Sequence, residues 1–413
     1  MRRHLLTAGK LLFVAGLMYW VLSNIQWRDS WVKIDPVAKQ ETRHFGYIQG
    51  AWDGVEVRFR SEDGGPPQVL RPDANLRVDP GLPTLWLNLR AGWFALGALC
   101  YLLTVSFASS RWWWLLEVNR LPIGYWAAYR YTWVGVFFNN VVPGQTGGAL
   151  VKAIYVMKRC HGERVPAMMS VVIDRILGLA SLSLLAAIAV LFYLDNSEFA
   201  TLAAVLWAVL AGVVLLGVVA FSRRIRSLIR LRDLLEKLPP KLSHVLKRID
   251  HAVYFYRGHK TGIFVWLLLG TINHVLSVAS YAFVGEALGV GIPMQDYFVL
   301  IPIIVIVSAV PIAPNGWGVG EFMFRRLFGD FGAPHLVGAD ALTATKVMGT
   351  RGVALSLLYR IHLTLWSLVG GVLFFFDKDK VTRAEMERQA AAEEVEEAQI
   401  DAEMEEASGA APR

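Results

Sequence analysis

The sequence predicts an all-α polytopic membrane protein with about six full spans, two broken or re-entrant helical hairpins in an inverted-repeat arrangement, and a small β-rich insert after the first helix. The chain of 413 residues is 55% hydrophobic, with a mean hydropathy of +0.42. That is more apolar surface than a soluble globule carries, and the apolar runs are long enough to span a bilayer. Two Gly- and Pro-rich segments, PGQTGG at 143–148 and PIAPNGWGVGE at 311–321, interrupt these runs. Such breaks occur at membrane depth only where the backbone is buried in protein or lines a polar cavity.

Charge and cysteine usage narrow the class of protein further. The net charge is +7, and eleven basic residues collect in 222–260, so we expect this loop to be cytoplasmic and to face anionic lipid headgroups rather than nucleic acid. The two cysteines, Cys100 and Cys160, form neither a CxxC motif nor a Cys/His set with metal-ligand spacing. We therefore expect no disulfide framework, no metal site and no cofactor; the sequence leaves the oligomeric state open.

The chain divides by composition into four parts. Residues 1–26 form a first transmembrane helix, because the apolar run follows basic residues but no small-residue cleavage site appears. Residues 27–84 alternate polar and apolar residues between turn signals, which indicates a small β-rich soluble insert. Residues 85–376 form the helical membrane domain, and residues 377–413 an acidic tail. Helices are expected near 86–109, 125–142, 166–194, 199–221, 262–288, 297–313, 335–350 and 352–376.

The distribution of basic residues predicts the orientation of these helices. A cytoplasmic loop at 222–260, with the N-terminus and the tail also inside, requires 125–157 and 290–350 each to enter and leave through one face. Two broken elements of opposite orientation are typical of an inverted repeat, with the substrate site between them near the bilayer midplane. In the alternative topology the N-terminus is outside and 125–142 is an ordinary span.

Asp174 and Arg175 are the first candidates for chemistry. They lie within the apolar sequence SVVIDRILGLASL, and a charge at the centre of a transmembrane helix costs about 2.5–3.5 kcal/mol. Such residues usually face a cavity or a partner. Neighbouring residues on a helix point about 100° apart, so each should have a partner elsewhere. A structural ion pair near the interface is the alternative.

The second break carries a further set of candidates. Glu321 follows Asn315, Gly316 and Gly318, and Arg325 and Arg326 come one turn later. Backbone amides freed at such a break, with the positive end of the next helix, can hold an anion such as phosphate. Glu321 would act as a proton-binding group or as a helix cap.

Two basic residues remain ambiguous. Lys152, four residues after Gly148, is either a phosphate ligand or a snorkelling interfacial lysine. Arg351 lies at the start of the last expected helix. There it is either a headgroup contact or an ordinary interfacial anchor. Other motifs predict structure only: His274 should make an interhelical hydrogen bond, and Trp112 to Trp114 an interfacial aromatic belt. GQTGGALVK and GWGVGE lack the spacing of nucleotide-binding loops.

The PGxxGG segment, the basic amphipathic stretch after it, SVVIDRILGL and the later PxxPxGxGxxE together resemble the family of the lysylphosphatidylglycerol synthase transmembrane region, over about residues 86–376. The resemblance implies a flippase-like domain in the cytoplasmic (inner) membrane of a prokaryote. Because only the acidic tail follows residue 376, we do not expect the aminoacyltransferase domain of the family or lysine transfer from tRNA, and the 27–84 insert is additional. Residues at the recurring positions of the family are Gly144, Gly147, Gly148, Asp174, Arg175, Gly316, Gly318 and Glu321.

The favoured function is therefore translocation of a phospholipid or lipid-linked headgroup between leaflets. With no nucleotide motif, the energy would come from a lipid gradient, the membrane potential or protonation of Glu321 or Asp174. Two alternatives remain open. One is a scaffold that recruits envelope or glycolipid machinery through the insert and the tail. The other is a membrane-embedded transferase with Asp174 or Glu321 as base, although no second catalytic group is evident.

Overall fold

The protein is described by a computed structural model. Its chain forms two compact units: residues 1–102 with 276–365, and residues 103–275 with 366–413. Apart from isolated positions, the described residues are 15–34, 41–73, 75–141, 147–160, 164–193, 206–215, 256–308, 316–336, 339–377 and 381–385 without 383. Most of the basic loop, the first eleven residues and the tail beyond residue 385 lie outside this set. The predictions for those segments therefore stay predictions.

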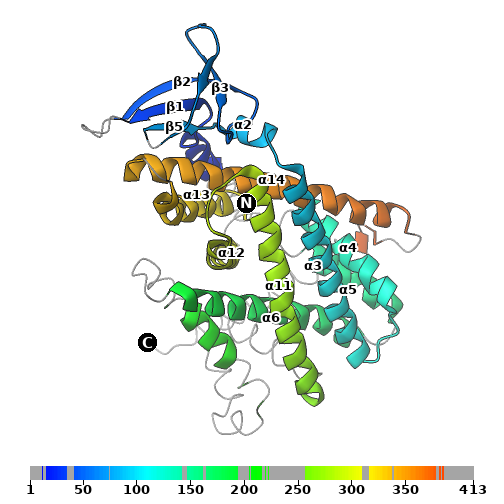
Figure 1. Cartoon of the computed structure of the whole chain (residues 1–413). Coiled ribbons are helices and arrows are strands. Elements are labelled where there is room, and N and C mark those ends of the chain that lie inside the picture. Colours follow the sequence, from blue (N-terminus) through cyan, green and yellow to red (C-terminus); the bar gives the residue numbers. More distant parts are fainter. Residues whose placement is uncertain are drawn as a thin grey trace, which may run out of the picture. The chain divides into compact units, whose positions relative to one another are not determined.

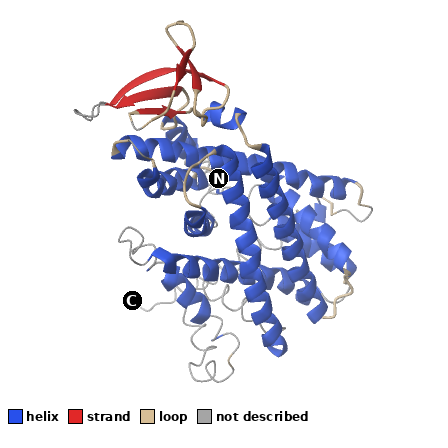
Figure 2. Cartoon of the chain, in the orientation of Figure 1, coloured by secondary structure: helices blue, strands red, loops and turns tan. Residues whose placement is uncertain are grey.

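The first unit begins with a helical segment at 15–23 and continues into a five-stranded antiparallel sheet (Figures 1 and 2). The strand order is β4-β3-β2-β1-β5. The strands are β1 (Asp29–Ile34), β2 (Glu41–Gln49), β3 (Val57–Ser61), β4 (Gln68–Leu70) and β5 (Leu76–Asp79). Alternation places Val57, Phe59, Leu70 and Val78 in one small hydrophobic core. The prediction of a small β-rich element is thus confirmed, and its strands lie between Asp29 and Asp79.

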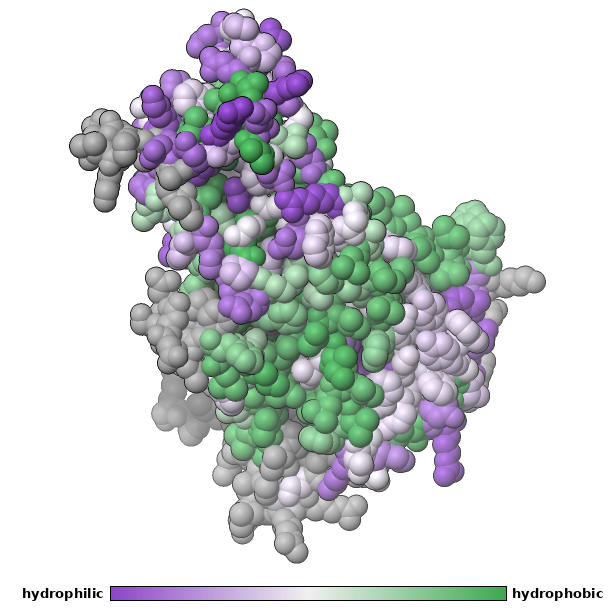
Figure 3. All heavy atoms as spheres, viewed as in Figure 1, coloured by the Kyte–Doolittle hydropathy of each residue, from purple (hydrophilic) through white to green (hydrophobic). Residues whose placement is uncertain are grey.

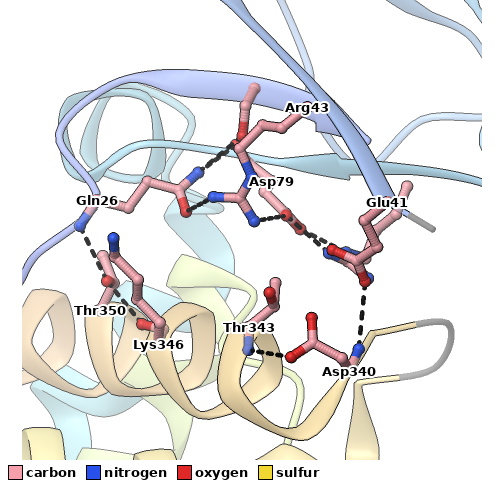
Figure 4. Close-up of polar contacts among 10 residues, drawn as sticks. Gln26, Glu41, Arg43, Asp79, Asp340, Thr343, Lys346 and Thr350 are labelled. Atoms are coloured by element: carbon pink, nitrogen blue, oxygen red, sulfur yellow. Dashed lines mark hydrogen bonds and ion pairs between the residues drawn. The ribbon is translucent and has the colours of Figure 1, made fainter. Parts of the chain in front are cut away.

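A polar network joins this sheet to helix α14 (Ala341–Phe375) of the same unit. Asp79 is fully buried and pairs with Arg77 at 2.8 Å and with Arg43 at 3.4 Å. The backbone amide of Gln26 donates to Thr350 Oγ1, and that of Asp340 donates to Glu41 Oε1. Figure 4 shows the sheet residues pointing toward the helix that carries Thr343, Lys346 and Thr350. Within its unit, the sheet region is therefore joined to α14 by a buried hydrogen bond at Thr350, and to the residue before α14 by an exposed one at Asp340.

The remaining helices of the first unit include one pair of short helices. Helix α2 (Leu82–Leu87) leads from the sheet into α3 (Ala91–Val118). Helix α12 (Met294–Ser308) packs on α13 (Val319–Gly332), and α14 follows after the short 3-10 turn η4 (Ala333–His335). The unit boundaries fall within α3, α14 and α11 (Lys260–Leu288), so each unit includes part of these three helices.

The second unit contains the same kind of pair. Helix α4 (Tyr125–Val141) packs on α5 (Gly147–Arg159), and α5 packs on the long helix α6 (Arg164–Val190), which ends in the 3-10 turn η1 (Leu191–Tyr193). Residues 206–215 are also helical. In each unit a pair of short helices is thus followed by a long one.

Four helices of the described part of the chain are long and apolar enough to cross a membrane: Ala91–Val118, Pro166–Val190, Lys260–Leu288 and Ala341–Phe375. Leucine, phenylalanine and valine side chains on α3 and α11 are exposed, as expected for surfaces in contact with lipid. Figure 3 shows hydrophobic residues over the helices and hydrophilic ones over the sheet. The chain is an integral membrane protein with several apolar helices. The predicted count of six spans also includes 11–25 and 199–221, which are only partly described.

One prediction for the helices is wrong. Residues 335–350 and 352–376 do not form two helices, because α14 runs unbroken from Ala341 to Phe375. Gly349 and Gly352, at the expected boundary, are packing positions. A Cβ at Gly349 would lie 2.9 Å from Arg325 O, and one at Gly352 would lie 2.6 Å from Phe328 Cβ. Their lack of a side chain lets α13 lie close against α14.

Candidate functional site: two buried charge clusters

In the second unit, three charged side chains from three helices meet around Asp174. Arg111 of α3 donates through Nε to Asp174 Oδ1 at 2.8 Å. Lys152 of α5 donates through Nζ to Asp174 Oδ2 at 3.2 Å. All three side chains are at most 12% exposed. Two cations therefore share one carboxylate, and these three groups together carry one net positive charge in a largely apolar surrounding.

Aromatic and small residues hold this cluster in place. The Lys152 ammonium lies 4.0 Å from the centroid of the Trp112 ring, a cation–π contact, and Trp112 Nε1 donates to Ser170 Oγ. One turn beyond Asp174, a Cβ at Gly178 would lie 3.4 Å from Arg111 Nη2. His274 Nε2 contacts Gly178 O at 2.9 Å, which confirms the predicted interhelical hydrogen bond. The aromatic-belt prediction is wrong for Trp112, because this ring is fully buried.

The hairpin of α4 and α5 brings Lys152 to this position. Gly148 lies so close to α4 that a Cβ there would stand 2.1 Å from Gly135 O, and its amide donates to Asn139 Oδ1 at 2.8 Å. Gly135 in turn leaves room for the Lys152 stem, whose Cγ would be 3.1 Å from a Cβ at that position. Gly148 of the PGQTGG segment, with Gly135 of α4, therefore permits close helix packing, as expected for small residues at helix interfaces in membranes.

In the first unit, Glu321 and Arg360 form a second cluster. Glu321 of α13 is fully buried and accepts a hydrogen bond from Arg360 Nε of α14. Its other oxygen accepts from the Gly318 backbone amide at 2.7 Å, so the carboxylate caps the start of α13. Arg360 Nη2 also donates to Gly316 O at 3.2 Å. Arg360 Cζ lies 4.4 Å from the centroid of the Trp317 ring, a cation–π contact.

The backbone of this turn requires glycine at two positions. Gly316 has a φ of +65° and Gly318 a φ of +79°, values that other residues rarely adopt. A Cβ at Gly320 would lie 3.0 Å from Arg360 Nη2. The Gly-rich segment therefore turns the chain sharply and brings its carbonyl and its carboxylate to one arginine.

In both clusters a charged side chain on the second short helix of a hairpin pairs with one on the next long helix, but the positions of the cation and the carboxylate are exchanged. In the second unit the second short helix supplies the cation, Lys152, and the long helix after it supplies the carboxylate, Asp174. In the first unit α13 supplies the carboxylate, Glu321, and α14 supplies the cation, Arg360. Each pair joins the second helix of a hairpin to the long helix that follows.

The remaining candidates take various positions. Arg175 is exposed, whereas Asp174 beside it is buried, so the two do point apart as predicted. Arg325 lies over the Trp20 ring at 4.6 Å, and Arg326 pairs with Asp330 on the surface. Gly147 is buried at the start of α5, whereas Gly144 and Asn315 lie outside the described residues.

Arg351 does not open the last helix, which is a correction to its predicted place. It lies within α14, is 8% exposed and donates through Nη1 to Val290 O at 3.1 Å. Whether it contacts a headgroup or anchors the chain at the interface stays a prediction.

Sequence reasoning missed two partners, Arg111 and Arg360. In the sequence, Arg111 stands out only as a basic residue next to three tryptophans. Arg360 lies in the apolar run LSLLYRIHL and carries the same signal that marked Asp174. Searching every apolar run for single charges would have found Arg360. In the described residues, no group of three or more His, Cys, Asp or Glu side chains could hold a metal ion.

Comparison with known proteins agrees with these features. No curated protein and no solved structure matches the sequence significantly. The family described as "Lysylphosphatidylglycerol synthase TM region" matches residues 80–373. This range includes both hairpins, both charge clusters, three of the four long apolar helices and all but the last two residues of the fourth. The chain therefore belongs to the lysylphosphatidylglycerol synthase TM region family.

Proposed function

We propose that this protein moves a phospholipid or a lipid-linked headgroup between the leaflets of the membrane. The observation that carries the proposal is the pair of buried charge clusters, each joining a hairpin of short helices to a long helix. Charges within membrane helices are expensive and usually mark a path for substrate or ions. A headgroup that crosses the bilayer needs such polar partners while its acyl chains stay in lipid.

The charge of the Asp174 cluster favours an anionic headgroup. Arg111 and Lys152 share the single carboxylate of Asp174, which leaves one positive charge of this group uncompensated. A phosphate group close to the cluster would neutralise it and lower the cost of keeping both cations in an apolar surrounding. A lipid whose headgroup carries a phosphodiester meets this requirement.

The proposal includes the predicted topology. Helices of 17 and 13 residues, as in α4 and α5, measure about 26 and 20 Å, less than the roughly 30 Å of the hydrocarbon core. We take α4–α5 and α12–α13 as two re-entrant hairpins of an inverted repeat, with the N-terminus and the tail in the cytoplasm. The shared substrate site, the energy source and the inner-membrane location of a prokaryote are parts of the same hypothesis. So is contact of the basic loop with anionic lipid.

The test is lipid exchange in reconstituted vesicles that hold a fluorescent phospholipid, with the outer leaflet bleached by a membrane-impermeant reductant. Removing a charged hydrogen-bond partner costs about 1.5–3 kcal/mol, so we expect Asp174→Asn and Glu321→Gln to slow exchange roughly 10- to 100-fold. Asp330→Asn removes the carboxylate of the exposed Arg326 pair and serves as the matched control. Rates equal to that of the unmodified protein in both cluster variants would remove the proposed roles.

A further inference from the structure

Arg351 is a buried arginine with an incompletely satisfied guanidinium. The residue is 8% exposed, Nη1 donates to Val290 O at 3.1 Å, and Nε is buried without a hydrogen-bond partner. Nε lies on the side-on edge of the guanidinium, which in proteins typically holds two oxygens of a carboxylate or phosphate. A buried N–H without an acceptor costs about 1–3 kcal/mol. This edge therefore favours an oxyanion.

The carboxylates near Arg351 already have other partners. Asp79 of β5 acts on Arg351 electrostatically, but it makes direct ion pairs with Arg77 and Arg43. Burial would lower the pKa of Arg77, yet Asp79 and Glu41 raise it above its usual value, so these carboxylates are strongly engaged with Arg77. This group of three arginines and two carboxylates keeps one net positive charge.

A tight glycine turn leads to the guanidinium of Arg351. Gly289 and Gly291 have φ values of +67° and +82°, and Val290 between them supplies the carbonyl that Nη1 contacts. Gly291 is exposed, and a Cβ there would lie 3.1 Å from Nη1. Because Gly291 has no side chain, this residue leaves the space between the surface and the Arg351 guanidinium open.

The β insert covers the same guanidinium with an aromatic ring. Trp52 lies in the connection between β2 and β3. Its ring centroid is 5.1 Å from Arg351 Cζ, a cation–π distance. A Cβ at Gly289 would lie 2.7 Å from this ring, so the glycine turn also makes room for it. The next residue, Asp53, forms an ion pair with Arg90 before α3. The β2–β3 connection is thus held by two contacts, the Trp52 ring on Arg351 and the Asp53 carboxylate on Arg90.

We propose that Arg351, under Trp52, is a binding site for an oxyanion, with phosphate as its chemical class. The guanidinium would hold two oxygens along its Nε edge, and the tryptophan would stack on its face. The phosphate could come from a phospholipid headgroup or from free phosphate. This site uses the β insert and none of the hairpin charges, so it goes beyond the proposed translocation.

The experiment measures thermal unfolding of the full-length protein in an uncharged detergent. One arm titrates sodium phosphate against sodium chloride at equal ionic strength, and the other adds dioleoylphosphatidylglycerol against dioleoylglycerol, which has no phosphate. We expect a concentration-dependent rise in the unfolding midpoint in at least one arm, because a ligand that binds only the folded state stabilises it. The arm that responds identifies the source of the phosphate.

Variants tie the effect to the site. Arg351→Gln should abolish the shift, and Trp52→Ala should weaken apparent affinity about 2- to 5-fold, the equivalent of an exposed cation–π contact. Arg326→Gln, on the exposed surface of α13, should keep the full shift. Arg351→Lys retains the charge but not the two-oxygen edge, and should bind more weakly while eluting as the folded protein on size exclusion. An undiminished shift in Arg351→Gln or in Arg351→Lys, or no shift in either arm for the unmodified protein, would overturn the proposal.

Discussion

Single charged residues decide the chemistry of this protein. Asp174 and Glu321 stand out in the sequence because each interrupts or borders an apolar run. Their partners are harder to predict. Arg111 lies 63 positions from Asp174, and Arg360 lies 39 positions from Glu321, so only the packing of the helices brings each pair together. A sequence shows which residues are costly to bury, but it does not show which opposite charge compensates them.

The Glu321 pair allows a prediction about stability at this scale. Glu321→Gln keeps an oxygen that can cap Gly318 but removes the charge opposite Arg360. Breaking a buried ion pair costs about 3–5 kcal/mol, and we expect about 3 here because the Arg360 side chain is 23% exposed. Unfolding of the purified protein by titration with sodium dodecyl sulfate measures the difference.

The control for this prediction is Asp330→Asn. Its exposed pair with Arg326 should contribute only about 0–1 kcal/mol. Equal losses in the two variants would show that the Glu321–Arg360 contact contributes no more than a surface pair.

At the scale of elements, glycine has two roles that the sequence does not separate. Gly316 and Gly318 sit in a turn with positive φ, as predicted for a broken helix. Gly349 and Gly352 lie within the continuous helix α14 and face α13. In the sequence alone, turn glycines and packing glycines cannot be told apart. A glycine in an apolar run therefore does not by itself mark the end of a helix, because close helix contact in membranes favours the same residue.

The sequence did not predict which helices the start of the acidic tail contacts. Asp377 lies 3.7 Å from Arg130 of α4, and Val381 is buried in the hydrophobic core of α4 and α5. Glu385 accepts hydrogen bonds from the Thr382 backbone amide and pairs with Lys158 of α5 at 2.8 Å. These contacts attach Asp377, Val381 and Glu385 to the first hairpin, within the second unit.

This attachment should depend on pH. The hydrogen bond from Lys158, followed by that from Thr382, lowers the pKa of Glu385 below its usual value of 4.5. A carboxyl with a lowered pKa in the folded state stabilises that state above its unfolded pKa, and the effect disappears as pH falls through the folded value. The difference in unfolding midpoint between the unmodified protein and Glu385→Gln should therefore be constant above the usual pKa of 4.5 and vanish as the pH falls through the lowered folded-state pKa. In a Lys158→Met background this difference should shrink. A difference that does not decrease as the pH is lowered below 4.5 would contradict the assignment.

At the scale of the whole molecule, composition and periodicity were sufficient for the class. Apolar run length predicted α4, α6 and α11 closely, and alternation predicted the sheet. The seat of the insert on α14 was not predictable, because it depends on buried polar contacts between residues as distant as Gln26 and Thr350. The prediction that both broken segments share one site concerns the two units together and stays a prediction.

The topology of the first hairpin is the last prediction, and cysteine accessibility tests it. Gly124 and Arg159 are exposed, Arg159 at the end of α5. Gly65, in the connection between β3 and β4, is half-buried, and a Cβ at Gly65 or at Gly124 would meet no atom within 4 Å. Cys100 and Cys160 are buried, so background labelling should be low. A re-entrant α4–α5 hairpin places positions 124 and 159 on the same face of the membrane, and α3 places position 65 on the opposite face. In intact cells, a membrane-impermeant maleimide should then label Gly65→Cys and leave Gly124→Cys and Arg159→Cys unlabelled until the cells are permeabilised. If residues 125–142 form an ordinary span instead, positions 124 and 159 will label from opposite faces.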